Sequence, residues 1–414
     1  MVRVLIFDTS SRLGAVGGAQ RVAANLFYEL PKRGIETFYL GYKTDYFKGD
    51  SPNIMFLTES KQKKLKDLGE RSKFQSLLES RIIRMGYYSF YSLKGINITE
   101  MKEFVESVKP DIVLASSILD YIILKRLKPY FGSATKIIYI EHANASGKYS
   151  GAFDYNIMQL TFGTGSFVGL EKARKRFFSF FDGVIALNME QYNSVKKYNK
   201  NVTIIHSSSL LADKKPTESR LESFKRKHGI HKGLKVVLYL GRLAEAQKNV
   251  SLLIKAFIAE PDPELRLFIV GEGKSKPLYE EMSKSDKRIK IVGRVPESEL
   301  PYYYSVSNLY VLPSIWESFN ATFIEAASFG SPLLLSKNAV NSDIKQKFEK
   351  RLLLFNPNDV EELREKMKLA LSNKIVRSSL IKLSKDIAFE YSKRVQMDAY
   401  ASAIKKLYYS GSLE

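Results

Sequence analysis

Two glutamates stand eight residues apart in the most distinctive segment of the chain, Pro313–Ala326. On one continuous helix their side chains would differ in direction by roughly 80°. We therefore expect Glu317 in a loop and Glu325 in the helix that follows, whose first turn lies near Asn320–Thr322. Asn320 can serve as the N-cap, and the free N–H groups of such a helix start can bind phosphate oxygens.

Glu325 needs a polar partner. It lies on an otherwise small and apolar helix face with Ala321, Ile324, Ala326 and Ala327. A carboxylate buried without a partner is costly. A sugar cis-diol satisfies both carboxylate oxygens, and the ribose of a nucleotide has one. The segment therefore predicts a nucleotide site.

A second segment supplies two cations at the end of a predicted strand. Arg242 follows strand residues 236–240, and Lys248 stands just before a predicted helix that begins at Val250. Two cations beside a helix start suit a pyrophosphate. Desolvated contacts of this kind contribute on the order of 1.5–3 kcal/mol each. We predict a diphosphate site here, and the alternative is an exposed basic loop.

A glycine-rich turn follows the first predicted strand and opens a helix. It contains Gly14, Gly17 and Gly18. Glycine lets a backbone approach a phosphate closely, and the helix start offers free N–H groups. The spacing differs from the dinucleotide fingerprint GxGxxG, and no Walker lysine follows. The segment is thus either a phosphate-binding loop or a structural turn only.

Strand-like and helix-like segments alternate along both halves of the chain. Helical periodicity marks Ala19–Leu30 in the first half and a segment from Val250 in the second. This alternation predicts parallel sheets with crossover helices, an α/β doubly wound fold in each half. The predicted strands are residues 2–8, 37–42, 112–115, 136–141, 183–187, 235–240, 266–270, 290–292, 309–312 and 332–335.

Length and composition indicate two globular domains. The chain has 414 residues, 44% hydrophobic and 26% charged, which is too long for one ordinary core and too apolar for disorder. Strand periodicity stops in the polar segment Ser207–Ser219, and a helical segment covers Ala388–Tyr409. We expect an N-terminal domain at residues 1–206, a C-terminal domain at 207–387, and a helix at 388–414 that packs back on the N-terminal domain. Ligands of doubly wound sheets bind beyond the carboxyl ends of the strands, so two facing domains predict a cleft.

Several short motifs occur along the chain in a characteristic order. Together they resemble the glycosyltransferases of the GT-B fold, specifically the retaining glycosyltransferase family 4, and the resemblance covers nearly the whole chain. It implies two Rossmann-like domains that face each other across a cleft. The motifs are Gly17–Arg21, Glu141-His142-Ala143, Gly241-Arg242-Leu243, Lys248-Asn249, Ile269–Gly273, Val292–Val295, Tyr303-Tyr304-Ser305 and the pair Glu317 and Glu325.

The resemblance implies a catalytic set of His142, Arg242, Lys248 and Glu317. The two cations would hold the donor diphosphate and stabilise the leaving group, and Glu317 would bind hydroxyls of the donor sugar. A single histidine at a strand end is more often structural. The resemblance implies instead that His142 contacts the donor sugar near the reacting carbon.

The resemblance also implies a wider donor-binding set. Glycines would close over the phosphates, main-chain N–H groups would reach sugar or phosphate, an arginine would line the base, and Glu325 would bind the ribose. The residues of this set are Gly17, Gly18, Arg242, Lys248, Arg294, Glu317, Phe319, Asn320, Ala321 and Glu325.

Two segments depart from the family pattern. The stretch after Glu317 is usually glycine-rich in the family, but here it reads Ser318-Phe319-Asn320. The usual Pro-Asn-Gly after the last strand of the first domain is replaced by His206-Ser207-Ser208. These departures affect the prediction of the donor sugar and of the hinge, and they leave phosphate binding intact.

The implied reaction moves a hexose or N-acetylhexosamine from a nucleotide-sugar with retention of configuration. Family grounds favour UDP, with guanosine as the alternative base. Retention can proceed through a covalent glycosyl-enzyme or through same-face attack assisted by the leaving phosphate. The second is preferred because the resemblance offers no dedicated nucleophile. No Asp-x-Asp motif occurs, so we expect no essential metal and no cofactor.

The net charge of +21 indicates an anionic partner, such as lipid headgroups, nucleic acid or an anionic polymer. Basic and apolar residues are interleaved in residues 61–84 and in Lys172–Phe178. Such a pattern suits a helix on a membrane surface, and it also suits a solvated helix face over a normal core. We expect the N-terminal domain to lie on an anionic membrane and to bind a saccharide, lipid-linked or cell-envelope polymer acceptor.

Other sequence features predict the location. No apolar run approaches the roughly 20 residues of a membrane span, and residues 2–8 read as a strand rather than a signal peptide. The absence of cysteine suits a reducing compartment. We expect a cytoplasmic protein, peripheral on the inner face of the cytoplasmic membrane.

Three alternatives belong to other classes of protein. A basic nucleic-acid-binding protein fits the charge, but the basic residues are dispersed and no RNA or DNA module is recognisable, so we expect no nucleic acid partner. A non-catalytic subunit with the same fold is disfavoured by the intact cations and glutamates. A nucleotide-sugar epimerase or a phosphorylase on the same fold would differ in its products or in its need for inorganic phosphate.

Overall fold

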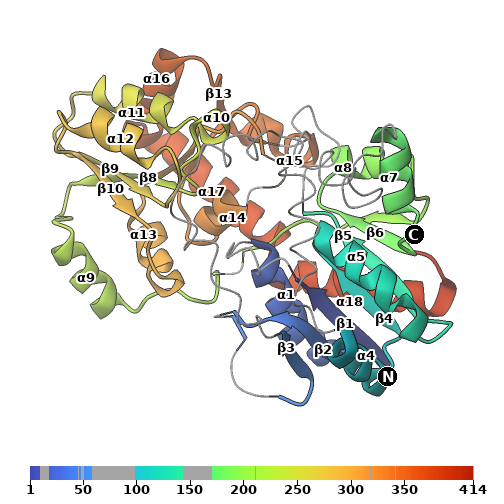
Figure 1. The fold of residues 1–414 in the computed structure, drawn as a ribbon. Coiled ribbons are helices and arrows are strands. Elements are labelled where there is room, and N and C mark those ends of the chain that lie inside the picture. Colours follow the sequence, from blue (N-terminus) through green and yellow to red (C-terminus); the bar gives the residue numbers. More distant parts are fainter. Residues whose placement is uncertain are drawn as a thin grey trace, which may run out of the picture. The chain divides into compact units, whose positions relative to one another are not determined.

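The structure is a computed structural model of the 414-residue chain. It describes residues 1–9, 18–44, 46–47, 51–57, 98–142, 170–209, 211–317, 319, 321–340 and 342–413. The chain forms two compact units (Figure 1). Unit 1 contains Met1–Ile205 and Met397–Glu414, and unit 2 contains His206–Gln396.

Unit 1 is built on a parallel sheet of seven strands in the order β3-β2-β1-β4-β5-β6-β7. Val4 of β1 pairs with Thr37 of β2 on one side and with Ile112 of β4 on the other. The strand order therefore reverses at β1, where doubly wound sheets bind ligands. The strands are β1 Val2–Asp8, β2 Ile35–Tyr42, β3 Ile54–Leu57, β4 Ile112–Ala115, β5 Lys136–Ile140, β6 Gly183–Ala186 and β7 Val202–Ile204.

Helices cover both faces of this sheet because its strands are apolar on both sides. Leu5 and Phe7 of β1 belong to the core on one face, with α4, α5 and α7. Val4 and Ile6 belong to the core on the other face, with α1 and α18. The helices are α1 Gly18–Glu29, α4 Ile98–Val108, α5 Ile118–Leu127, α7 Leu170–Phe178, α8 Met189–Val195 and α18 Lys393–Ser410, with 3-10 turns η2 Pro31–Arg33 and η4 Lys128–Tyr130.

Unit 2 repeats this design with a parallel sheet of six strands in the order β10-β9-β8-β11-β12-β13. Val237 of β8 pairs with Leu267 of β9 and with Leu309 of β11. The order therefore reverses at β8, so the switch point lies between β8 and β11. The strands are β8 Lys235–Leu240, β9 Leu265–Val270, β10 Ile289–Gly293, β11 Leu309–Leu312, β12 Leu333–Ser336 and β13 Leu353–Phe355.

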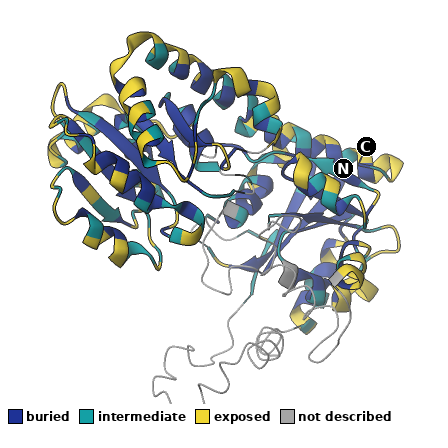
Figure 2. Ribbon diagram, turned by 90° about the horizontal axis from the view of Figure 1, so that it is seen from above, coloured by how far each residue is buried: buried dark blue, intermediate teal, exposed yellow. Residues whose placement is uncertain are grey.

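Two cores also enclose the sheet of unit 2. One contains residues of α13, α14, α15 and α17, and the other contains residues of α11 and α16. Figure 2 shows the strands largely buried and the exposed residues on the outer faces of the helices. The helices are α9 Glu218–Lys227, α10 Glu245–Lys248, α11 Val250–Ile258, α12 Lys276–Ser283, α13 Leu300–Val306, α14 Ala321–Ser328, α15 Ser342–Phe348, α16 Val360–Ser372 and α17 Lys374–Glu390, with 3-10 turns η5 Glu297–Glu299 and η6 Glu349–Arg351.

The two parallel-sheet α/β domains predicted from the sequence are confirmed. Three strands were not predicted from the sequence. They are β3, β7 and β13, which have four, three and three residues. All three lie at sheet edges. Their residues are mostly half-buried, whereas equally short strands that were predicted, such as β4 and β11, lie inside the sheets and are buried throughout.

The prediction of one helix over Ala388–Tyr409 is wrong at its start, because α17 and α18 are separate helices. Tyr391 lies between them, and its carbonyl accepts a hydrogen bond from the Ser209 N–H at 3.2 Å. Helix α18 packs into the core of unit 1 through apolar residues that include Tyr400.

The apolar residues of α7 do not form a membrane-surface face. Phe177 and Phe178 are 0% and 1% exposed and belong to the core of unit 1. The pattern in this helix is therefore a solvated basic face over a normal core. Its exposed cations are Lys172, Lys175 and Arg176. The other basic segment, residues 61–84, lies outside the described residues. Among the helices that the structure describes, none has both the length and the hydropathy of a membrane span.

Candidate functional site

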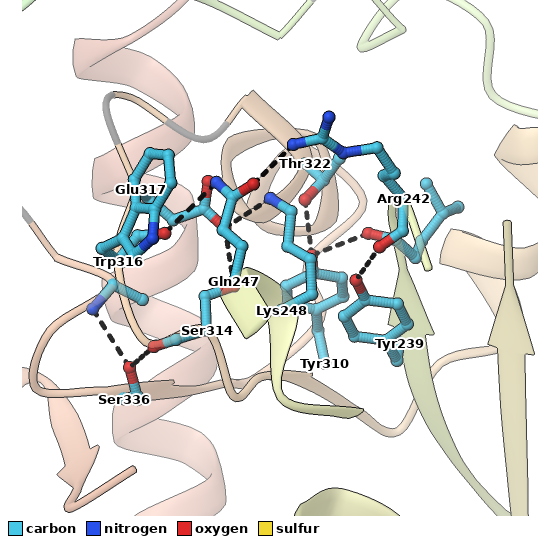
Figure 3. Close-up of polar contacts among 12 residues, drawn as sticks. Tyr239, Arg242, Gln247, Lys248, Tyr310, Ser314, Trp316, Glu317, Thr322 and Ser336 are labelled. Carbon is cyan, nitrogen blue, oxygen red and sulfur yellow. Dashed lines mark hydrogen bonds and ion pairs between the residues drawn. The ribbon is translucent and has the colours of Figure 1, made fainter. Parts of the chain in front are cut away.

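The loops after β8 and β11 carry the predicted cations and the first glutamate, and these two strands are neighbours in the sheet of unit 2. Hydrogen bonds join the loops directly (Figure 3). The Ile315 N–H donates to the Gln247 carbonyl at 2.8 Å. The Gln247 side-chain amide donates to the Trp316 carbonyl at 3.4 Å. The turn α10 is therefore held against the loop that carries Glu317.

Lys248 and Glu317 form a buried ion pair. The distance from Lys248 Nζ to Glu317 Oε1 is 2.5 Å, and the two side chains are 11% and 7% exposed. Ser314 Oγ donates to the same Oε1 at 2.6 Å. Two predicted site residues, one from each loop, thus contact each other directly.

Arg242 is exposed, and its guanidinium is directed toward Gln247 of α10. Arg242 Nη2 donates to Gln247 Oε1 at 2.5 Å. A residue of β8 holds the main chain of Arg242, because the Tyr239 hydroxyl donates a hydrogen bond to the Arg242 carbonyl at 2.9 Å. The structure therefore places both predicted cations beside Gln247 (Figure 3).

Gly271 explains why the segment after β9 is rich in glycine. Its φ is +147°, and a Cβ atom there would lie 1.8 Å from the Gly241 carbonyl oxygen. A Cβ at Gly273 would lie 2.1 Å from the Leu243 carbonyl oxygen. Only glycine allows this segment to pack against the loop that carries Arg242.

The start of α14 is tied to the same strand ends. The Tyr310 hydroxyl lies 2.6 Å from Thr322 Oγ1 and donates to the Leu240 carbonyl at 3.3 Å. Since α14 begins at Ala321, these bonds place its first turn at the end of β8. Free N–H groups of a first turn can bind an anion.

Glu325 lies in α14 and is 1% exposed, whereas Glu317 lies in the preceding loop, as predicted. The Tyr304 hydroxyl donates to Glu325 Oε2 at 2.8 Å. A polar partner for this carboxylate is expected from the sequence, but spacing along the chain does not identify Tyr304. The signal was present in the motif Tyr303-Tyr304-Ser305, where a tyrosine on an apolar helix face needs a partner for its hydroxyl.

The remaining predicted residues fall in several places. Phe319 is half-buried in the loop before α14, and Ala321 begins that helix. Arg294 is exposed after β10, two strands away from β8. Gly18 begins α1. Gly17 and Asn320 lie outside the described residues.

His142 follows β5 in unit 1 and is half-buried. Burial lowers the pKa of its imidazole to about 4. The ring is therefore neutral at pH 7, where it can donate one hydrogen bond and accept another.

Buried acids lie at the carboxyl edge of the sheet of unit 1. Asp8, Asp120 and Glu141 are all 0% exposed. Asp8 ends β1, Glu141 follows β5, and Asp120 lies in the first turn of α5 after β4. None of these three acids is among the site residues predicted from the sequence.

Asp120 links the ends of β1 and β4. Its Oδ1 accepts from the Thr9 N–H at 3.0 Å and from the Thr9 hydroxyl at 2.5 Å. Its Oδ2 accepts from the N–H groups of Ser116 and Ser117 at 3.1 and 2.8 Å. Burial, followed by the charge of Asp8, raises the pKa of Asp120 to about 7, although its hydrogen bonds act in the opposite direction.

The chemistry of the unit 2 site is that of an anion receptor. It combines cations with the N–H groups of a helix start, and it places a buried carboxylate one turn further along α14. Within the described residues, no group of three or more histidine or acidic side chains is arranged to hold a metal ion.

Comparisons with known proteins give a family match and a fold. Residues 221–386 match the model of the family Glycosyl transferases group 1. The alpha-monoglucosyldiacylglycerol synthase of Acholeplasma laidlawii is 26% identical over 197 residues, which are 46% of this chain and 48% of that protein. The chain thus spans about half the length, or less, of the first curated relatives that it matches.

Solved structures resemble the whole chain. Sucrose-phosphate synthase from Thermosynechococcus elongatus has a TM-score of 0.71 at 15% identity, over 99% of both chains. HepE of Anabaena, in complex with UDP and glucose, has a TM-score of 0.66 at 15% identity, over 98% of this chain and all of that one. These likenesses confirm the predicted GT-B fold.

The raised pKa of Asp120 predicts how the stability of the protein depends on pH. The folded chain holds this proton up to about pH 7, whereas an unperturbed aspartate releases it near 3.8. Between these values the folded form binds more protons, so the free energy of unfolding falls as the pH rises. Asp8→Asn removes one cause of the shift, and this fall should become smaller. Urea unfolding followed by circular dichroism at pH 5 and pH 7.5 measures the difference.

Glu103→Gln, an exposed carboxylate of α4, is the matched control and should leave the pH dependence unchanged. An equal fall in wild type and in Asp8→Asn would contradict the assignment.

Proposed function

Residues 221–386 of this chain belong to the Glycosyl transferases group 1 family, and on this premise we propose that the protein is a retaining glycosyltransferase. It takes a hexose or N-acetylhexosamine from a nucleotide-sugar, with UDP as the favoured nucleotide. Its acceptor is a saccharide, a lipid-linked saccharide or a cell-envelope polymer.

One observation carries the proposal: Lys248, Arg242 and the first turn of α14 lie together at the carboxyl ends of β8 and β11. Cations and helix N–H groups at a switch point suit a diphosphate. Lys248 is already held in place by Glu317, so it needs no rearrangement to meet the ligand. This preorganisation favours stabilisation of charge on a departing diphosphate.

The glutamates orient the rest of the donor in this proposal. Glu325 lies one turn inside α14, and its carboxylate accepts hydrogen bonds from the ribose hydroxyls. Glu317 Oε1 accepts hydrogen bonds from Lys248 and Ser314. Its second carboxylate oxygen, Oε2, accepts a hydrogen bond from a hydroxyl of the sugar. Arg294 contacts the base. His142 of unit 1 acts on the donor sugar as a neutral ring, a role that comes from the family resemblance.

The sugar transfers with retention, through same-face attack assisted by the leaving phosphate. The cationic groups supply the stabilisation that a metal provides in other transferases, so we propose that no metal or cofactor is required.

The acceptor side of the proposal rests on charge and on one relative. That relative is named for a glucosylated diacylglycerol, a lipid product. In unit 1, α5 and α7 are neighbours, since the rings of Tyr121 and Phe177 lie 5.2 Å apart. We give the name α5–α7 face to the exposed cations of α5, of the turn η4 that follows it and of α7, and propose that these cations bind the anionic inner face of the cytoplasmic membrane by charge, without insertion of apolar residues. The cations are Lys125, Arg126, Lys128, Lys172, Lys175 and Arg176.

Removal of one cation tests the donor site. Arg242 is exposed, so Arg242→Ala should leave the fold intact. It should weaken binding of UDP about 10- to 100-fold, since a charged hydrogen bond contributes about 1.5–3 kcal/mol. Isothermal titration calorimetry measures the affinity, with Arg220→Ala on the exposed face of α9 as control. Equal binding by wild type and Arg242→Ala would refute the proposed site.

Glu325→Gln should reduce the preference for UDP over its 2′-deoxy form.

Transfer should continue in excess EDTA at the rate observed without it. The assay follows release of UDP from UDP-sugars in the presence of candidate acceptors. Complete loss of activity that magnesium or manganese restores would overturn the proposal of metal independence.

The α5–α7 face should bind vesicles that contain phosphatidylglycerol, and added salt should weaken this binding. The triple variant Lys172→Gln/Lys175→Gln/Arg176→Gln should bind about 100-fold more weakly, at about 1 kcal/mol for each cation near the surface. Vesicle sedimentation measures it. The triple variant Lys225→Gln/Arg226→Gln/Lys227→Gln on α9 makes the same charge change in unit 2. Equal losses in both variants would show that net charge alone drives binding.

A further inference from the structure

The two segments that depart from the family pattern contact each other. His206 begins unit 2, and Phe319 lies two residues after Glu317. Their rings are stacked, with centroids 5.5 Å apart and planes at 22°. Tyr391 contacts both rings edge-on, at 5.4 Å from His206 and 5.8 Å from Phe319. We call these three residues the aromatic cluster.

Two members of the cluster are held in place without Phe319. The His206 carbonyl accepts from Gln396 Nε2 at 2.9 Å, and Gln396 Oε1 accepts from the Ser208 hydroxyl at 2.6 Å. The Tyr391 carbonyl accepts from the Ser209 N–H at 3.2 Å, and Tyr391 is only 4% exposed. His206 and Tyr391 thus form a fixed surface on which the Phe319 ring packs.

Phe319 connects this surface to the donor site. It is separated by one residue from Glu317 and by one residue from Ala321, where α14 begins. The main chain of a loop that lacks such contacts takes many conformations, and its ordering on binding lowers the affinity for a ligand. A phenylalanine anchored by two rings restricts the same main chain before the ligand arrives.

We propose that His206 and Tyr391 are positioning residues for donor binding, and that they act by anchoring Phe319. The inference rests on the proposed function, because the main chain near Phe319 is placed there as part of the donor site. The contacts of the aromatic cluster order the main chain of Phe319 before a ligand binds.

Trp316 offers a probe of this loop, because it is the single tryptophan of the chain and lies three residues before Phe319. Acrylamide quenching of its emission reports the accessibility of the loop in protein without ligand. This readout needs no knowledge of the donor. Calorimetric titration with UDP supplies the second readout.

The experiment compares His206→Ala, His206→Phe and a control. His206→Ala removes ring contacts with Phe319 and Tyr391, and should weaken UDP binding up to about tenfold, a factor equal to about 1.4 kcal/mol. It should also increase quenching of Trp316. His206→Phe keeps an aromatic ring, so its UDP affinity should stay within about twofold of wild type. Tyr198→Ala, which removes a stacked pair with Phe178 in unit 1, should change neither readout.

Each outcome decides one question. Unchanged quenching or unchanged UDP affinity in His206→Ala would overturn the inference. A loss in His206→Phe as large as that in His206→Ala would also overturn it, and would assign the effect to the contact of the imidazole with Asp343 at 3.8 Å. If wild type binds neither UDP nor GDP, the proposed function fails, and the quenching result still tests the anchoring of Phe319.

Discussion

The buried ion pair between Lys248 and Glu317 joins two loops that lie 69 residues apart in the chain. Removal of one partner from such a pair costs about 3–5 kcal/mol, because the other charge is left buried and uncompensated. The pair therefore fixes Lys248 at the ends of β8 and β11, with Ser314 completing the environment of the carboxylate. A cation held in place before the ligand arrives is what electrostatic stabilisation of a leaving diphosphate requires.

Buried tyrosines connect this pair to the core of unit 2. Tyr239 of β8 holds the main chain after that strand, and Tyr310 of β11 holds the first turn of α14. Tyr304 of α13 holds the carboxylate of Glu325. Each ring packs in the core while its hydroxyl bonds to a segment of the proposed donor site. Core packing and the geometry of the site are therefore coupled in this unit.

Prediction from the sequence succeeded where a local pattern has one physical meaning. Long apolar runs such as β1 and β8 are buried on both faces, so they identify parallel strands, and polar residues after them lie at one sheet edge. Arg242, Lys248 and Glu317 were placed in this way. Tyr304 was missed because spacing along the chain does not reveal which helix packs beside Glu325. The sequence left two interpretations of α7 open, because a basic helix over a core and a helix on a membrane have the same periodicity.

A crystal structure of the full chain with bound UDP tests the central claim most directly. The account predicts diphosphate oxygens within hydrogen-bond distance of Lys248 Nζ and of N–H groups in the first turn of α14, with the ribose hydroxyls at Glu325. A nucleotide whose diphosphate lies away from Lys248, or which binds at another part of the chain, would contradict it.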